Sequence, residues 1–124
     1  MIILYLVKMD IRNSIITGEK GLFSTKKYKQ NEVLHILSGD IYDKPLRETI
    51  HIGNNKHIYD KYGIYLNHSC TPNINIVGDK LVAARDIEID EELFFNYNDT
   101  EINMACPFYD NNILICGRQI NHKN

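Results

Sequence analysis

The segment at residues 65–73, YLNHSCTPN, concentrates side chains that can do chemistry. Within it His68, Ser69 and Cys70 offer an imidazole, a hydroxyl and a thiol in direct succession. A Cys–His hydrolase would use such groups as base and nucleophile, but immediate neighbours in sequence seldom reach triad geometry, and no oxyanion-hole motif accompanies them. Three roles therefore stay open for this segment: nucleophile, metal ligand, and backbone that contacts a ligand.

A second segment with chemical potential is EELFFNY, which ends in Tyr97. A tyrosine that closes an apolar strand is usually a core residue whose hydroxyl reaches water. On a rigid strand end, the same hydroxyl can face a reacting group. The role of Tyr97 therefore depends on what the fold places beside it.

The bulk composition is that of one folded domain. The chain has 124 residues, 44% apolar and 24% charged, with a net charge of -2, which gives no global argument for nucleic acid or an anionic membrane. The apolar stretch at residues 1–7 is too short to span a bilayer or to act as a full signal peptide. Three cysteines without such a signal favour a reducing compartment. We expect an intracellular protein.

Most of the chain is predicted to form short strands. Residues 40–62 show no clean period, and we expect a short helix and loops there; the tail from Asn98 to Asn124 is expected to be irregular. Gly78 and Asp79 separate two apolar runs and predict a β-hairpin. The fold class is therefore mostly β with little helix. The predicted strands are Ile2–Val7, Ser14–Ile16, Leu22–Ser24, Val33–Leu37, Ile74–Val77, Leu81–Ala84 and Leu93–Tyr97.

In this order and spacing, the segments resemble SET-domain protein lysine methyltransferases over roughly residues 12–120. NHSCTPN at 67–73 matches the central motif of that family at every characteristic position. EKGLFS resembles the glycine-rich first motif, with Glu19 in place of a glycine. LVAARDIEIDEELFFNY resembles the strand, turn and catalytic strand that follow, with Asp90 for Gly and Asn96 for Asp; NYNDTEINMACPF resembles the start of the tail in small stand-alone members.

The resemblance implies a single SET domain over residues 1–124, with a core at 12–97 and a tail similar to a post-SET segment at 98–124. The implied fold is a β-clip of small curved sheets with a pseudoknot-like crossing. The implied reaction is methyl transfer from S-adenosyl-L-methionine to a lysine amine. That reaction needs alignment, exclusion of water and oxygens facing the methyl group. A sulfonium and an apolar channel both lower the pKa of the amine from about 10.4, so no strong general base is required.

The family pattern assigns roles to named residues. Tyr97 matches the catalytic tyrosine. Phe95 stands at a position where the family carries Phe or Tyr. A Tyr there restricts the product to monomethyl-lysine, whereas Phe leaves room for more methyl groups and so favours di- or trimethylation. Ser69 and Asn73 are expected to tie the crossing together. The expected cofactor-binding residues are Lys20, Gly21, Leu22, Phe23, Asn67 and His68; the expected walls of the lysine channel are Tyr65, Phe95 and Tyr97.

The tail departs from relatives that bind zinc through one central-motif cysteine and three tail cysteines. Tyr109 and its neighbours stand where a Cys-x-Cys pair is expected. We expect the zinc to be lost and the tail to close by packing of Phe108, Tyr109, Ile113 and Ile115. The alternative is a Cys3His site made of Cys70, Cys106, Cys116 and His122.

The expected partner is a basic, lysine-containing peptide or protein, with a histone tail foremost. Residues 86–110 hold eight acidic and no basic side chains, which would attract a cationic partner, unless they are simply a solvated face. A histone substrate would place the protein in the nucleus, on chromatin. We expect no membrane and no direct nucleic-acid contact, and a homodimer could supply missing substrate surface. A catalytically silent SET-fold module that binds a peptide or partner protein is the alternative, motivated by Glu19, Asp90, Asn96 and the depleted tail cysteines.

Overall fold

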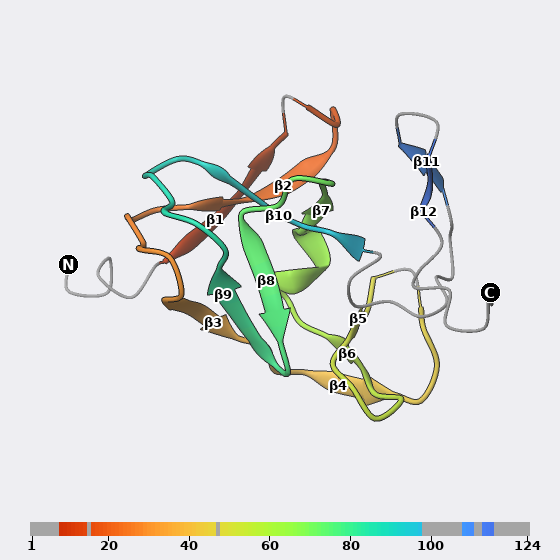
Figure 1. The fold of residues 1–124 in the computed structure, drawn as a ribbon. Coiled ribbons are helices and arrows are strands. Elements are labelled where there is room, and N and C mark those ends of the chain that lie inside the picture. The colour runs from red at the N-terminus through yellow and green to blue at the C-terminus, as the bar shows by residue number, and fades with distance from the viewer. Residues whose placement is uncertain (1–7, 15, 47, 98–107, 111–112, 116–124) are drawn as a thin grey trace.

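The computed structural model describes residues 8–14, 16–46 and 48–97, together with the backbone of residues 108–110 and 113–115. These residues form small sheets and little helix (Figure 1), which confirms the predicted fold class. The strands are β1 (Met9–Asn13), β2 (Lys20–Ser24), β3 (Val33–Ile36), β4 (Asp40–Tyr42), β5 (Ile50–His51), β6 (His57–Tyr59), β7 (Asn67–His68), β8 (Ile74–Val77), β9 (Lys80–Ala83), β10 (Glu92–Phe95), β11 (Phe108–Asp110) and β12 (Ile113–Ile115), and η2 (Gly63–Tyr65) is a 3-10 turn.

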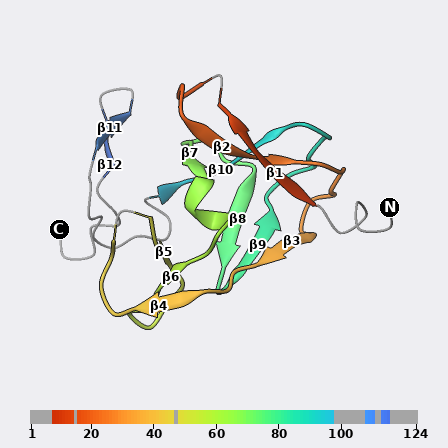
Figure 2. The same cartoon turned by 180° about the vertical axis from the view of Figure 1, so that it is seen from behind.

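The sheet β1-β2-β10-β7 brings together three segments that are distant in sequence. Strand β10 pairs antiparallel with β2, with Leu93 opposite Leu22, and parallel with β7, with Phe95 opposite His68. Figures 1 and 2 show β10 between these two neighbours from both sides. The residues near positions 20, 67 and 95 therefore meet along one strand.

The two faces of β10 have different environments, because successive side chains of a strand point to opposite faces. Leu93 and Phe95 are buried, whereas Glu92 and Phe94 are half-buried. Cross-strand partners share a face, so Asn67, the partner of Phe94, lies on the Glu92 side. The core of the domain lies on the other side, with Leu22, Leu34, Ile58, Ile74, Leu81, Ile87 and Leu93 among its buried members.

Two further three-stranded sheets, β3-β9-β8 and β4-β6-β5, complete the described part of the fold. The predicted hairpin is confirmed as β8 and β9, which pair with Val77 opposite Lys80. Gly78 turns the chain there with φ of +61°, a conformation that glycine adopts without penalty. Among the described residues, no helix is long and apolar enough to cross a membrane.

The predicted strand Ser14–Ile16 is wrong, because the first described strand ends at Asn13. The Ser14 N–H donates to the Glu19 carbonyl at 2.6 Å, and the Gly18 N–H donates to the Ser14 carbonyl at 3.0 Å. These bonds close a turn that ends strand pairing before Ser14. The predicted strand at residues 2–7 lies outside the described residues.

Two other expectations are wrong. Residues 40–62 were expected to contain a short helix, but β4 and β5 instead pair on either side of β6. The tail was expected to be irregular, but β11 and β12 form an antiparallel hairpin with Asp110 opposite Ile113. These strands are two or three residues long, so none displays enough of a two-residue period to be recognised.

A buried carboxylate fixes the segment that leads into the candidate site. Asp60 is 1% exposed; it accepts the N–H groups of Ser38, Tyr62 and Gly63 at 2.7–2.9 Å and a hydrogen bond with His35 at 3.0 Å. Burial by itself raises the pKa of Asp60, but the hydrogen bonds from His35 and the three amides outweigh it and lower the pKa to about 2. Asp60 therefore anchors η2, which immediately precedes Leu66 and β7.

Candidate active site

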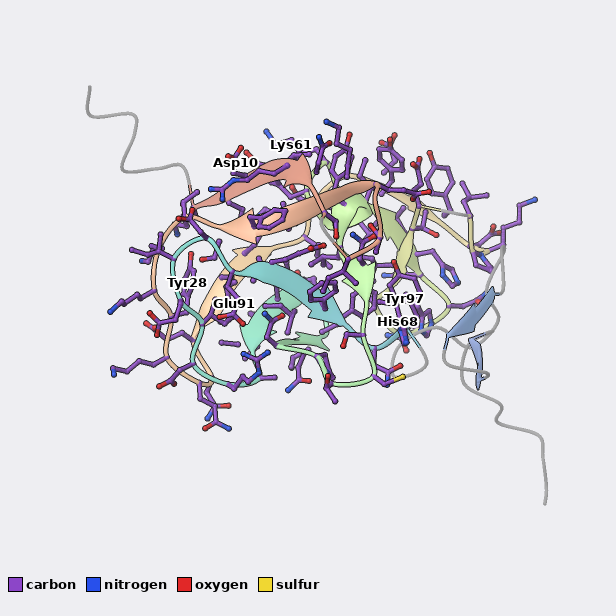
Figure 3. All side chains as sticks on the ribbon, turned by 90° about the horizontal axis from the view of Figure 1, so that it is seen from above. Asp10, Tyr28, Lys61, His68, Glu91 and Tyr97 are labelled. Carbon is purple, nitrogen blue, oxygen red and sulfur yellow. The ribbon has the colours of Figure 1, made fainter. Side chains whose placement is uncertain are left out.

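Tyr97 lies two residues beyond Phe95, the end of β10, and its ring packs on residues of both β10 and β7. Its ring centroid is 4.9 Å from that of Phe95 and 5.2 Å from that of His68, and Figure 3 shows His68 and Tyr97 side by side. The Tyr97 hydroxyl donates to the Leu66 carbonyl at 2.7 Å. The phenolic oxygen is therefore held beside the residue that precedes the Asn67–His68 pair.

The His68 side chain positions the backbone of Tyr97. Its Nδ1 accepts the Tyr97 N–H at 3.1 Å, so in the neutral ring the proton is on Nε2. This Nε2 lies 3.5 Å from the Cys70 sulfur. The family pattern gave His68 a cofactor contact through its backbone; the imidazole has this additional role, which the sequence did not indicate.

Asn67 joins β7 to β2 and to the start of β10. Its Nδ2 donates to the Lys20 carbonyl at 3.1 Å and to Glu92 Oε2 at 3.0 Å. Both partners are acceptors, so the amide nitrogen must face them and the amide oxygen must face away. Asn67 thus presents an acceptor on the side that is not engaged with the protein.

Gly21 permits the close approach of these groups. A Cβ at this position would overlap the Glu92 carboxylate and would lie 3.2 Å from Asn67 Nδ2. The absence of a side chain at the buried Gly21 therefore lets the Glu92 carboxylate and the Asn67 amide pack against the backbone of β2.

The other predicted residues of β2 differ in what they can contribute. Lys20 is exposed, and Leu22 is fully buried in the core. Leu22 could therefore line a cofactor site only through its backbone. Phe23 is half-buried, and the Arg12 guanidinium carbon lies 5.2 Å from the centre of its ring.

Asn73 was expected to tie the crossing together, and within the described residues it bonds to β10. Asn73 is 1% exposed; its Nδ2 donates to the Glu92 carbonyl at 2.8 Å and to Glu91 at 2.9 Å, and its Oδ1 accepts the Phe94 N–H at 2.8 Å. Ser69 contributes through its backbone, since its N–H donates to Phe95 while its hydroxyl bonds locally to Thr71. The loop after Tyr97 that would complete the crossing lies outside the described residues.

The predicted channel residues lie on the core side of β10. Phe95 is 4% exposed, and Tyr65, the last residue of η2, packs against the same core. Sequence reasoning assigned both to the walls of a lysine channel, and both lie within a few residues of the Leu66–Tyr97 hydrogen bond.

The alternative metal set falls largely outside the described residues, where Cys106, Cys116 and His122 lie. Cys70 is exposed, and its sulfur lies 3.5 Å from His68 Nε2. Within the described part of the chain, no three His, Cys, Asp or Glu side chains gather in a way that could hold a metal ion.

The acidic run before β10 is extensively paired inside the fold. Glu88, Asp90 and Glu91 form ion pairs with Lys27, Arg12 and Arg85 at 3.7, 2.9 and 2.8 Å, respectively. Burial raises the pKa of Glu91, but hydrogen bonds from Glu88, Asn73 and Arg85 outweigh it, and the net pKa is lowered. These pairings favour a solvated, internally compensated face over an open anionic rim.

Asp90, which replaces a usual glycine, has a left-handed backbone with φ of +69°. Its carboxylate forms an ion pair with the Arg12 guanidinium. A non-glycine residue pays about 1–2 kcal/mol for this conformation, and the fold accommodates it. The departure from the family pattern at Asp90 therefore leaves the turn before β10 intact.

Comparisons with known proteins agree with this arrangement. A family model described as the SET domain matches residues 15–98. A curated relative, the SET domain and MYND-type zinc finger protein 6 of Schizosaccharomyces pombe, is 49% identical over 41 residues, and the match spans 30% of this chain and only 8% of that relative.

Solved structures share the fold. A Plasmodium falciparum protein described as a candidate histone methyltransferase aligns with a TM-score of 0.60 and 26% identity, over 73% of this chain and 96% of that chain. The Polycomb Repressive Complex 2 of Chaetomium thermophilum, a humanized mutant bound to the inhibitor GSK126, aligns with a TM-score of 0.62 and 20% identity, over 94% of this chain and 19% of that chain. Since the family model covers more than half of the chain, this protein belongs to the SET-domain family.

Proposed function

We propose that this protein transfers a methyl group from S-adenosyl-L-methionine to the side-chain amine of lysine in a protein. The observation that carries the proposal is the convergence on β10 of Gly21, the Asn67–His68 pair and Tyr97. Family membership supports the reaction class, and the similar Plasmodium falciparum protein is described as a candidate histone methyltransferase.

The chemistry of Asn67 fits the proposed cofactor, because its outward amide oxygen suits the ammonium of an amino acid. Lys20, Gly21, Phe23 and Asn67, with the backbone of Leu22 and His68, would hold the cofactor. When bound, the cofactor supplies an electrophilic methyl group on a sulfonium.

Tyr97 would act just beyond the end of β10. Its hydroxyl donates to the Leu66 carbonyl, which holds the phenolic oxygen beside the Asn67–His68 pair, where it would face the polarised C–H groups of the methyl donor. The buried Phe95 ring and the half-buried Tyr65 ring would exclude water from the incoming amine. An apolar surrounding lowers the pKa of that amine, which must be neutral to attack.

The proposed substrate is a basic protein, with a histone foremost and hence a nuclear location. This part of the proposal rests on the histone methyltransferase description of the Plasmodium falciparum structure rather than on surface charge, since the acidic run before β10 is paired with Lys27, Arg12 and Arg85.

The test combines binding with transfer. S-adenosylhomocysteine is titrated into the protein by calorimetry, and histones are incubated with labelled cofactor and analysed by mass spectrometry. We expect saturable binding and lysine methylation. Tyr97→Phe keeps the ring packing against His68 but removes the oxygen, so binding should persist while transfer falls at least about 100-fold.

Each contrary result has a distinct meaning. A folded protein that binds no S-adenosylhomocysteine would contradict the proposal. Binding without transfer to any lysine substrate would identify a silent SET-fold module instead. Equal transfer by Tyr97→Phe would remove Tyr97 from the catalytic role.

A further inference from the structure

We propose that Glu92 is a cofactor-positioning residue, and that its carboxylate makes the site select donors that carry a free α-ammonium group. This inference rests on the proposed function, and it concerns a residue to which the sequence motifs gave no role in the site.

Glu92 begins β10 at the junction of the three segments that form the candidate cofactor site. Its Oε2 accepts from Asn67 at 3.0 Å and its Oε1 accepts from the Ser14 hydroxyl at 2.7 Å. The carboxylate also occupies the space that a Cβ at Gly21 would need. Glu92 therefore contacts Asn67, which the family pattern assigns to the amino-acid end of the cofactor, and Gly21, which it assigns to close approach of the backbone to the cofactor.

The charge of Glu92 sets it apart from its neighbours. Glu88, Asp90 and Glu91 each have a Lys or Arg partner, but among the described residues no basic side chain forms an ion pair with Glu92. Its described partners, Ser14 and Asn67, are neutral donors. A carboxylate can accept about four hydrogen bonds, so Glu92 keeps capacity for a cationic ligand, and a half-buried anion gains from one.

Asn67 adds a second acceptor at the same place. Both of its amide protons are committed, one to the Lys20 carbonyl and one to Glu92, so only its oxygen is free to meet a ligand. An ammonium group has three donors and no acceptor. A carboxylate and an amide oxygen that lie side by side match it, and they do not match a ligand that ends in an alkyl group.

Ser14 holds the carboxylate in place. It is 3% exposed, and its oxygen also accepts the Thr17 N–H at 3.2 Å within the turn that leads to Gly21. The turn that stands in place of the predicted strand Ser14–Ile16 therefore delivers a hydroxyl to Glu92.

The experiment compares two ligands on Glu92→Gln. S-adenosylhomocysteine carries the ammonium, whereas 5′-methylthioadenosine has the adenosine and thioether but no amino acid. A hydrogen bond to a charged group is stronger than one between neutral groups, so we expect calorimetry to show S-adenosylhomocysteine binding weakened at least about tenfold. Binding of 5′-methylthioadenosine should be unchanged. Glu88→Gln, which neutralises an exposed carboxylate outside the site, is the matched control and should alter neither.

Three results would overturn the inference. Unchanged S-adenosylhomocysteine binding by Glu92→Gln would remove Glu92 from the site, while an equal loss for both ligands would indicate a purely structural role. If the unmodified protein binds neither ligand, both the proposed function and this inference are wrong.

A second variant keeps the idea testable if Glu92→Gln does not fold. Ser14→Ala leaves the carboxylate in place but releases it from its hydroxyl donor. We expect S-adenosylhomocysteine binding to weaken about threefold, because the carboxylate loses the hydroxyl that orients it, while 5′-methylthioadenosine binding stays unchanged. Unaltered binding of both ligands by a folded Ser14→Ala protein would contradict the inference.

Discussion

At Gly21 the need for glycine comes from space rather than from backbone conformation. A Cβ there would meet the Glu92 carboxylate, and it would lie 2.9 Å from the carboxyl carbon. The obstructing atoms are the end of a flexible side chain, so Glu92 can swing aside at modest cost. Swinging aside would, however, break its hydrogen bonds to Asn67 and Ser14.

Gly21→Ala is therefore expected to weaken cofactor binding strongly while lowering the free energy of unfolding only slightly. Urea unfolding should show a loss of about 1 kcal/mol, the low end for overpacking, while S-adenosylhomocysteine binding measured by calorimetry should weaken at least about tenfold. In a Glu92→Ala background the clash is absent, so the same Gly21→Ala change should add little to either loss. Equal effects in both backgrounds would show that the clash with Glu92 is not the cause.

The sequence could identify only part of this cluster. Gly21, Asn67 and Tyr97 were grouped through the family motifs, because no local period links positions so far apart. Glu92 was read as part of an acidic run. The signal that would have separated it is alternation: Leu93 and Phe95 are apolar, so Glu92 must lie on the face opposite the core.

At the scale of elements, Asn73 connects the segment after β7 to β10. It satisfies the Phe94 N–H and the Glu92 carbonyl, and it is almost fully buried. A backbone N–H or carbonyl that is buried from water and loses its hydrogen-bond partner lowers the free energy of unfolding by about 1–3 kcal/mol.

Asn73→Ala should accordingly lower the free energy of unfolding by about 3 kcal/mol, because it leaves the Phe94 N–H and the Glu92 carbonyl without that partner. Urea denaturation followed by circular dichroism measures the change. Asn75→Ala, on the exposed side of β8, is the matched control and should cost less than about 0.5 kcal/mol. Similar losses for the two variants would refute the connecting role of Asn73.

The elements that sequence patterns predicted best are the strands of four or five residues other than β1. The hairpin β8–β9 and the strands β2, β3 and β10 were placed within two residues of their ends. The sheet β4-β6-β5 was not predicted because its strands, of two or three residues each, are too short to show a two-residue period. In the tail, Asn111 and Asn112 separate two apolar runs, a pattern that indicates a hairpin.

At the scale of the whole molecule, acid stability depends on two buried groups with different pH windows. Burial, and then the adjacent His51, lower the pKa of His57 below 6.5, against an opposing effect of Asp43. The unfolded chain therefore binds the His57 proton first, and stability falls as the pH drops below about 6.5. Asp60, with a pKa of about 2 against 3.8, stabilises the fold above about pH 4 and loses that effect only as the pH falls toward 2.

His57→Phe tests the first window. Within the described residues His57 Nδ1 is buried without a hydrogen-bond partner, so a phenyl ring of similar shape should leave stability at pH 7.5 unchanged or higher. Urea unfolding at pH 7.5 and 5.5 should show a smaller drop for His57→Phe than for the unmodified protein. Asp43→Asn removes the influence that opposes the lowered pKa of His57, so its drop should be larger. A His57→Phe protein that keeps the full drop would assign the acid sensitivity of this fold to another group.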